Sequence, residues 1–403
     1  MRLAIFVRKL CWRSSNSPTG YATSAAFPFQ VSALSKLFDA TRVIVECSAP
    51  DNRAGETYFT GRNLSVVPLS KMPTSVFWRR LALPVWLMRN GVTMVREVAR
   101  ADAVYAVLLG DIGVLGMFLA FAMRKRLFVR HSNNWFQQKT FMERFERWFL
   151  ERIAGGRNVV LATGESDERP SSRNPNIGWI FATSLTEREL QTHAVQRRTL
   201  LSQRLRLIVV ARQEMAKGTD ILLKSLSLVR EKLPSVVLDV VGDGSALPKL
   251  KRIADELQLQ TSVIFHGLAN HRQVMDLLQH ADLFCLPTEE SEGFTKAILE
   301  ALSCGLPVVT VRLPVFLRLI DSRCGVLIDE RTPEALATAI TWCLTDRDRY
   351  QKMSREAIQT ARSYSLERWC NTVHELLETA WGPLQGESAE NNHLAHLSSS
   401  TRT

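Results

Sequence analysis

The sequence has no C-x-x-C pair, and its seven cysteines are scattered and odd in number. Most of them lie in apolar runs, as Cys285 does between Phe284 and Leu286. A disulfide framework and a cysteine-based zinc site are therefore disfavoured. We predict reduced cysteines in the core of a cytosolic protein.

A secretory leader and a long uninterrupted apolar run are also missing. The amino-terminal run MRLAIFVRKLCW is short, and Arg8 and Lys9 close it. The longest apolar stretch, residues 103–123, is interrupted by Asp111 and contains three glycines. We interpret it as a buried strand, a turn at Gly110 and a buried helix, and a membrane span is the less favoured alternative.

Negative charge is in short supply, with 51 Lys+Arg against 40 Asp+Glu and a formal net charge of +11 at pH 7. Such an excess suits nucleic acid, an anionic membrane surface or a phosphate-rich small ligand. Nucleic acid is the poorest fit, because no recognition module is present and the basic residues are spread out. The remaining composition is ordinary for a globular protein, and 403 residues are enough for two domains.

Short β-branched runs alternate with longer helical segments along most of the chain. The runs are continuous in apolar residues, which predicts strands buried on both faces in parallel sheets covered by helices. We expect strands of a first series at residues 3–7, 42–45, 104–108, 127–129 and 159–161. A second series is expected at residues 207–210, 236–241, 263–265, 283–286, 307–311 and 325–328.

The predicted fold class is therefore α/β, with two Rossmann-like, doubly wound domains that face a central cleft. We expect an amino-terminal, acceptor-side domain over residues 1–186, a linker over 187–204 and a second domain over 205–365. A final helix over 366–382 should pack back toward the first domain, and the tail 383–403 should be disordered. Ligands of such sheets bind at the carboxyl ends of the strands, so both sets of strand-end loops should face the cleft.

An acidic loop and a helix follow the strand that ends at Pro287. The helix is expected from Gly293 to Cys304, and its unpaired N–H groups and positive dipole end suit a phosphate. Glu292 lies just before it, and Glu300 lies about 12 Å further along the helix. The two carboxylates could bind hydroxyls on either side of a diphosphate, which is the layout of a nucleotide-sugar. Taken alone, the segment is equally consistent with a solvated acidic loop.

Three other strand ends of the second half carry suitable groups. Arg212 and Lys217 follow the strand at 207–210 and could neutralise a diphosphate without a metal. Gly242 stands in a tight turn that permits close backbone approach, and at Leu268 a base could rest against the backbone.

Four segments in this order and spacing form a recognisable pattern: Arg212-x4-Lys217-Gly218, Val241-Gly-Asp-Gly244, Phe265-x-Gly267 and Glu292-Gly-Phe-x5-Glu300-Ala. The pattern resembles glycosyltransferase family 4, the glycosyl transferases group 1, whose members are retaining enzymes with the GT-B fold. The resemblance is specific over about residues 207–329 and only architectural over the first domain.

The resemblance implies a nucleotide-diphosphate sugar as the donor, with no metal and no other cofactor. It assigns the diphosphate to Arg212 and Lys217, and the ribose hydroxyls to Glu300. Glu292 would bind hydroxyls of the donor sugar, with the backbone of Gly293, Phe294 and Thr295 nearby.

The chain departs from the family pattern at two places. Thr295 stands where the family often has glycine, although variants with lysine next, as Lys296 here, are familiar. The usual Gly-Gly-x-Pro-Glu turn is replaced by Arg312-Leu-Pro-Val-Phe316, which puts the contribution of that loop in doubt.

Two residues of the first domain match the family less closely. Gly20 is the best match to the family's phosphate-contacting glycine loop, with a plain strand-to-helix turn as the alternative. His131, at an expected strand end, resembles the histidine that touches the donor sugar near the reacting carbon.

The sequence says less about the acceptor, which should be a glycan or a lipid-linked molecule. Residues 76–89 mix Trp78 and Trp86 with arginines, which suits either contact with an anionic membrane or a helix packed on the sheet with a solvated basic edge. The predicted function is a transferase of cell-surface polysaccharide or glycolipid synthesis, located in the cytoplasm or at the inner face of the cell membrane. A nucleotide-sugar epimerase of the same fold and a non-catalytic donor-binding protein are the alternatives.

Overall fold

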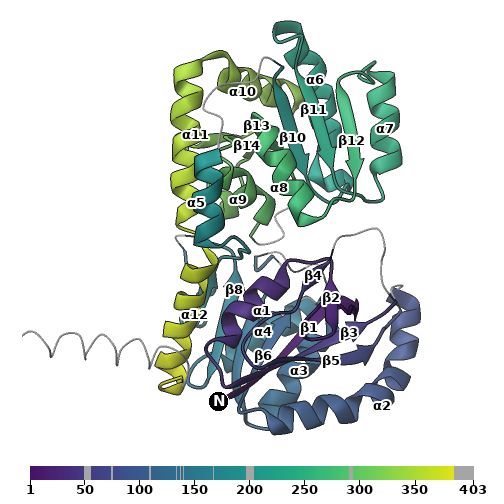
Figure 1. Ribbon diagram of the computed structural model, residues 1–403, viewed down its shortest axis with the longest axis vertical. Helices are drawn as coiled ribbons and strands as arrows, with labels where there is room; N and C mark the ends of the chain where they lie inside the picture. Colours follow the sequence, from purple (N-terminus) through teal and green to yellow (C-terminus); the bar gives the residue numbers. More distant parts are fainter. Residues whose placement is uncertain are drawn as a thin grey trace, which may run out of the picture.

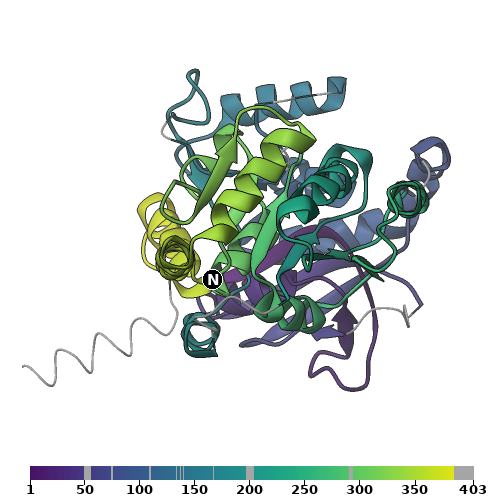
Figure 2. The same ribbon diagram turned by 90° about the horizontal axis from the view of Figure 1, so that it is seen from above.

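The structure is a computed structural model that describes residues 1–49, 56–73, 76–108, 110–132, 134–136, 138, 140–166, 168–196, 204–289 and 294–384. It forms two α/β lobes, stacked in Figure 1, and the view from above in Figure 2 shows the second lobe lying over the first. Within the described residues, no helix has both the length and the apolar character needed to cross a membrane.

The first lobe is built on a largely parallel sheet. Its strands are β1 (Arg2–Arg13), β2 (Tyr21–Thr23), β3 (Ala40–Cys47), β4 (Thr57–Tyr58), β5 (Leu64–Ser70), β6 (Ala103–Leu108), β7 (Arg126–His131), β8 (Asn158–Thr163) and β9 (Ile177–Ile180). The parallel order is β5-β3-β1-β6-β7-β8-β9, and β2 and β4 extend the sheet as antiparallel strands beside β1. The apolar runs of the sequence form β1, β3, β6, β7 and β8, as predicted.

Helices cover both faces of this sheet, which explains why its strands are apolar on both sides. One apolar core lies under α2 (Val76–Arg100), α3 (Asp111–Ala122) and α4 (Phe141–Ile153). The core of the opposite face lies under α1 (Phe27–Ser35) and α12 (Leu366–Trp381). The stretch weighed above as a membrane span therefore forms β6, which is buried, and α3, one face of which is buried in the first lobe.

The second lobe contains a wholly parallel sheet in the order β12-β11-β10-β13-β14-β15. Its strands are β10 (Arg206–Val210), β11 (Val237–Val241), β12 (Val263–Gly267), β13 (Leu283–Leu286), β14 (Val308–Val311) and β15 (Gly325–Ile328). The helices of this lobe are α5 (Glu187–Gln196), α6 (Thr219–Lys232), α7 (Leu247–Glu256), α8 (His271–His280), α9 (Lys296–Ser303), α10 (Pro333–Thr345) and α11 (Arg347–Arg362). The chain order reverses between β10 and β13, which is the switch point where such sheets bind ligands.

The chain crosses between the lobes twice. The first crossing lies between β9 and α5. The segment expected as a linker begins with α5, whose Leu190 is buried in the core of the second lobe, and its residues 197–203 lie outside the described part. At the second crossing α12 leaves α11 and packs against the first lobe, as Figure 1 shows. Trp369 of α12 is fully buried there, and Leu384 beyond the helix is buried as well. Residues 385–403 of the expected tail are outside the described residues.

Candidate functional site

A buried glutamine organises the loop that carries the two predicted diphosphate ligands. Gln213 has no exposed surface, and its Nε2 donates to the carbonyl oxygens of Ala211 and Val241, each at 3.0 Å. Its Oε1 accepts a hydrogen bond from Thr219 Oγ1 at 2.8 Å. Gln213 therefore ties the end of β10 to the end of β11 and to the start of α6. Sequence reasoning missed this residue, because a glutamine between two cations in a loop carries no pattern.

Arg212 and Lys217 flank this anchor. Arg212 is exposed at the loop, and Lys217 is the last residue of a 3-10 turn, η1 (Met215–Lys217). Gly218 follows with φ of 77°, and a Cβ there would lie 2.2 Å from the carbonyl oxygen of Pro287. Only glycine therefore allows this loop to approach the end of β13.

Gly242 also serves close packing. It has φ of 120°, and a Cβ would lie 1.9 Å from the carbonyl oxygen of Ala211. In this turn, the absence of a side chain on Gly242 lets the loop at Ala211 pack closely against it. Leu268, after β12, is 54% exposed and offers an apolar surface at the same edge of the sheet.

The helix expected at residues 293–304 begins later than predicted. Helix α9 starts at Lys296, with Thr295 in extended conformation as its N-cap and no side-chain cap on its first N–H groups. Phe294 is buried and packs against Phe181 and Tyr364, with ring centroids 6.2 and 5.6 Å apart. This anchored aromatic ring lies directly before Thr295, the extended N-cap residue. Glu292 and Gly293 lie outside the described residues.

Glu300 lies inside α9, is 9% exposed, and contacts a histidine that the sequence did not single out. Its Oε1 is 3.5 Å from Nδ1 of His271, the first residue of α8. The hydrogen bond with Glu300 raises the pKa of His271 from its usual 6.5, while burial opposes the rise. Behind this pair, burial and the charge of His271 lower the pKa of His193 on α5, whose Nδ1 is 3.3 Å from Ser303 Oγ.

The contact of His271 with Glu300 should make stability depend on pH. Because the folded-state pKa of His271 is raised, the contact stabilises fully below pH 6.5 and is lost as the pH rises through that raised pKa. We expect His271→Asn to lower the thermal unfolding midpoint more at about pH 5.5 than at about pH 8.5. The control is His280→Asn at the other end of α8, where the ring contacts the carbonyl oxygen of Asp276. An equal drop for His271→Asn at both pH values would contradict the assignment.

The first domain brings His131 and Gly20 to its own sheet edge. His131 ends β7, is 2% exposed, and meets the ring of Trp135 edge-on at 5.1 Å. Gly20 has φ of 76° and closes the turn between β1 and β2, with its N–H donating to Ser17 O. The turn is a β-hairpin and not the strand-to-helix turn considered from the sequence. Strand β1 is longer than expected and continues to Arg13 before it turns.

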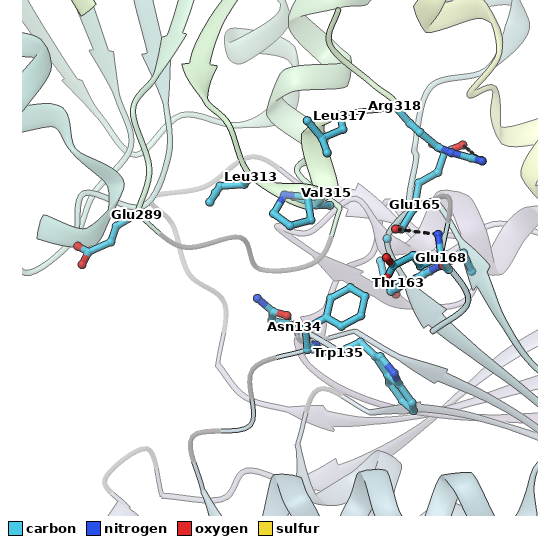
Figure 3. Close-up of a pocket in the computed structure, with 15 residues that line it drawn as sticks. Asn134, Trp135, Thr163, Glu165, Glu168, Glu289, Leu313, Val315, Leu317 and Arg318 are labelled. Atoms are coloured by element: carbon cyan, nitrogen blue, oxygen red, sulfur yellow. Dashed lines mark hydrogen bonds and ion pairs between the residues drawn. The ribbon is translucent and has the colours of Figure 1, made fainter. Parts of the chain in front are cut away.

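A cavity of about 490 Å³ opens between the domains, and its lining includes Trp135, the ring that His131 contacts. Trp135, Phe136 and Trp179 line it from the first domain. From the second domain come Leu313 and Val315, and Figure 3 shows them facing Asn134 and Trp135. The second-domain residues belong to the loop that departs from the family pattern, so this departure shapes the cavity.

At one end of the cavity, the carboxylate of Glu165 links the two walls. Glu165 accepts a hydrogen bond from Tyr364 Oη at 2.6 Å, and Arg318 Nη1 lies 3.6 Å from Glu165 Oε1. The contact joins the first domain to a residue that follows α11, and it fixes the spacing of the two walls. Burial and Glu165 together raise the pKa of Tyr364.

Residues 194–360 match the sequence profile of the family described as glycosyl transferases group 1. The resemblance predicted from the sequence is confirmed over this part of the chain, which is less than half of its length. The stretch includes Arg212, Lys217 and Glu300, as the resemblance predicted.

Curated relatives match over the same region. The chain is 29% identical over 183 residues to a poly(glycerol-phosphate) alpha-glucosyltransferase of Bacillus subtilis, covering 44% of this chain and 27% of the relative. It is 30% identical over 177 residues to a D-inositol 3-phosphate glycosyltransferase of Corynebacterium urealyticum, covering 42% of this chain and 41% of the relative. The match thus spans less than half the length of either relative.

The whole fold has counterparts among solved structures. The structure of Anabaena HepE in complex with UDP and glucose superposes with a TM-score of 0.68 at 16% identity, covering 94% of this chain and all of that chain. The predicted GT-B fold is confirmed. Among the described residues, no group of three or more His, Cys, Asp or Glu side chains could hold a metal ion.

Proposed function

We propose that this protein is a retaining glycosyltransferase that moves a sugar from a nucleotide-diphosphate sugar to a glycan or lipid-linked acceptor in polysaccharide or glycolipid biosynthesis. The observation that carries the proposal is the group 1 region itself, with Arg212 and Lys217 on an anchored loop and Glu300 held by His271 in the same domain. His131 belongs to the facing domain, so the donor sugar would lie between them.

The donor would lie along the strand ends of the second domain. Arg212 and Lys217 would bind its diphosphate, and Glu300 its ribose hydroxyls. The base would rest near Leu268 and Gly242, and the sugar near the backbone of Phe294 and Thr295. Glu292 and Gly293 complete this assignment from the resemblance.

The chemistry that suits these groups is front-face substitution with retention. The leaving phosphate oxygen accepts the proton of the acceptor hydroxyl as the new glycosidic bond forms. Arg212 and Lys217 stabilise the negative charge that develops on the diphosphate, in place of a metal ion. We therefore propose activity without any cofactor, which should persist in excess chelator.

The cavity beside His131 is our candidate for the acceptor. Indole and phenyl rings such as Trp179 and Phe136, 5.4 Å apart, offer apolar faces on which a sugar ring packs. Glu165 and Arg318 at its edge supply the polar groups that would orient hydroxyls.

Transfer can be tested by incubating the protein with nucleotide-sugars and acceptor lipids or glycans and measuring the release of nucleoside diphosphate. We expect release that requires an acceptor and that falls at least about tenfold in Glu300→Ala, because a charged hydrogen-bond acceptor is lost. A change of the sugar without acceptor would indicate an epimerase instead. Tight donor binding without turnover on any acceptor would indicate a binding protein.

We further propose that the protein works at the cytoplasmic face of a membrane, with α2 as the contact. Helix α2 forms an outer edge of the first lobe (Figure 1) and has an exposed apolar stripe made of Trp78, Leu81, Val85, Met88, Val92 and Val95. Arg89, Arg96 and Arg100 are exposed on the same helix, and its one carboxylate, Glu97, is buried and paired with Arg42. An apolar stripe with only positive charge beside it suits an anionic lipid surface, and a second copy would bring like charges together.

The structure divides the residues that suggested this contact. Trp86 is buried, and its Nε1 donates to Ser70 O at 2.7 Å, so it packs the helix on the sheet. Arg79 pairs with Asp111 at the start of α3, and the side chain of Arg80 lies outside the described residues. Of these two tryptophans, Trp78 is exposed on the stripe and Trp86 is not.

Binding to vesicles containing about one-third anionic lipid tests this contact. We expect Met88→Glu to abolish co-sedimentation, because a carboxylate would enter the apolar stripe. Val195→Glu is the control, since Val195 is exposed on α5 of the other domain. If both variants sediment like the unchanged protein, α2 is not the contact.

A further inference from the structure

Three basic residues that the donor assignment does not use come from both domains and lie within electrostatic range of one another. Lys9 lies on β1 and Arg130 on β7, at the carboxyl edge of the first sheet. Lys296 is the first residue of α9 in the second domain. Arg130 is fixed in place, because its Nη1 donates to Gln30 Oε1 of α1 at 2.7 Å.

Electrostatic interactions place these groups close together. Burial is the largest cause that lowers the pKa of Lys296 to about 8, and the charges of Arg130 and Lys9 contribute to this shift against the opposing effect of Glu300. Burial likewise lowers the pKa of Lys9, with additional effects from Arg130 and Arg212. Cations of both domains therefore face one another in the same partly buried space.

These three cations lack the partners that buried charges normally have. Within the described parts of the chain, none of them forms an ion pair with a carboxylate, unlike Arg206, which pairs with Asp239. Arg130 is only 7% exposed, and its Nε has no hydrogen-bond partner. A buried, unpaired cation costs free energy, and like charges add repulsion, so the cluster is stable only if something else is gained.

We propose that Lys9, Arg130 and Lys296 form a phosphate subsite that the two domains close together. The N–H groups at the start of α9 carry no side-chain cap and lie beside Lys296, which adds the donors that suit phosphate. The inference rests on the proposed function for its context, since a nucleotide-sugar donor already places a diphosphate at Arg212 and Lys217.

Charge balance indicates what the subsite adds. A donor diphosphate carries two negative charges, which Arg212 and Lys217 match. Three further cations leave an excess that a second phosphate would balance, and a phosphate on the acceptor would supply it. A diphosphate held by both domains at once is the other source of the same chemistry.

Calorimetric titrations separate the two sources. UDP, GDP and ADP are titrated into the intact protein, and inorganic phosphate is then titrated into the protein saturated with the diphosphate that binds. The same titrations are made with Lys9→Gln and Lys296→Gln, and with Arg2→Gln as the control. Arg2 lies at the other end of β1, where it pairs with Asp102 at the surface. Thermal unfolding of each variant without ligand confirms folding, and we expect an unchanged or higher midpoint for Lys9→Gln because repulsion is relieved.

For an acceptor phosphate, both cleft variants weaken phosphate binding to the loaded protein by about tenfold or more, and the nucleotide dissociation constant stays within about twofold. For a diphosphate held by both domains, both variants weaken nucleotide binding by about tenfold, and no separate phosphate binds. The proposal is overturned if both variants match the unchanged protein and Arg2→Gln in every titration. Phosphate binding without any transfer activity would leave the subsite standing and refute the proposed function.

Discussion

Replacing Arg212 by glutamine is expected to lower kcat by about 10²- to 10³-fold. This is the usual effect of removing one preorganised group that stabilises a developing oxyanion. In our account its guanidinium neutralises the diphosphate as the bond to the sugar breaks, so the loss falls on the transition state more than on donor binding. The measurement is steady-state release of nucleoside diphosphate at saturating donor.

Lys224→Gln provides the matched control for this experiment. Lys224 is an exposed cation on α6, the helix that begins just after the loop of Arg212 and Lys217. We expect its kcat to stay within about twofold of the unchanged protein, since exposed charges away from a site contribute little. If Arg212→Gln retained the activity of Lys224→Gln, the assignment of the leaving-group site would be wrong.

Asp239→Ala is expected to lower the free energy of unfolding of the second domain by about 3 kcal/mol. The substitution removes one partner of a buried ion pair and leaves the opposite charge without compensation. Asp239 is 1% exposed, and both its oxygens are bonded. Arg206 donates through Nε at 3.0 Å and Nη2 at 2.7 Å, and His266 Nε2 lies 2.7 Å from Oδ1. The network joins β10, β11 and β12, so its loss should weaken the half of the sheet beside the switch point.

Urea unfolding followed by circular dichroism measures this loss, and faster amide exchange in β10 to β12 would locate it. Asp102→Ala is the control, because Asp102 pairs with Arg2 at the surface of the first domain. Solvent-exposed pairs of this kind stabilise little, so its effect should be small. Equal effects of the two substitutions would show that burial of Asp239 does not matter.

The sequence predicts the second domain better than the first, for a physical reason. Most strands of the second sheet are largely apolar because helices cover both faces, and all six strands were predicted, including the partly exposed edge strand β12. In the first sheet, β2 and β4 are too short to carry a pattern. Strand β5 contains Pro68 and pairs only with β3, and a strand with proline at an edge reads as a loop.

The candidate site shows the same division. Arg212, Lys217 and Glu300 stand at fixed spacings within a single domain, so their pattern is visible in the chain. His271 contacts Glu300 in space, and Gln213 bonds to Val241 and Thr219, and the sequence encodes neither arrangement at a fixed separation. Lys9 reads in the sequence only as the end of an apolar run, and its partners come from another strand and another domain.

The start of α9 was misplaced for a related reason. Acidic residues and a glycine suggested a helix beginning at residue 293, and the structure begins it at Lys296. The three-ring contact of Phe294 with Phe181 and Tyr364 anchors the chain directly before Thr295, the extended N-cap residue of the helix. Two of these rings lie far from Phe294 in the sequence, so tertiary packing decided the boundary.

The most direct test of the central claim is a calorimetric titration of UDP-, GDP- and ADP-sugars into the unchanged protein and into Glu300→Ala. We predict that one of these donors binds the unchanged protein and that its dissociation constant rises at least about tenfold in the variant. A donor that bound both proteins with equal affinity, or no binding of any donor, would contradict the assignment of this cleft to a nucleotide-sugar.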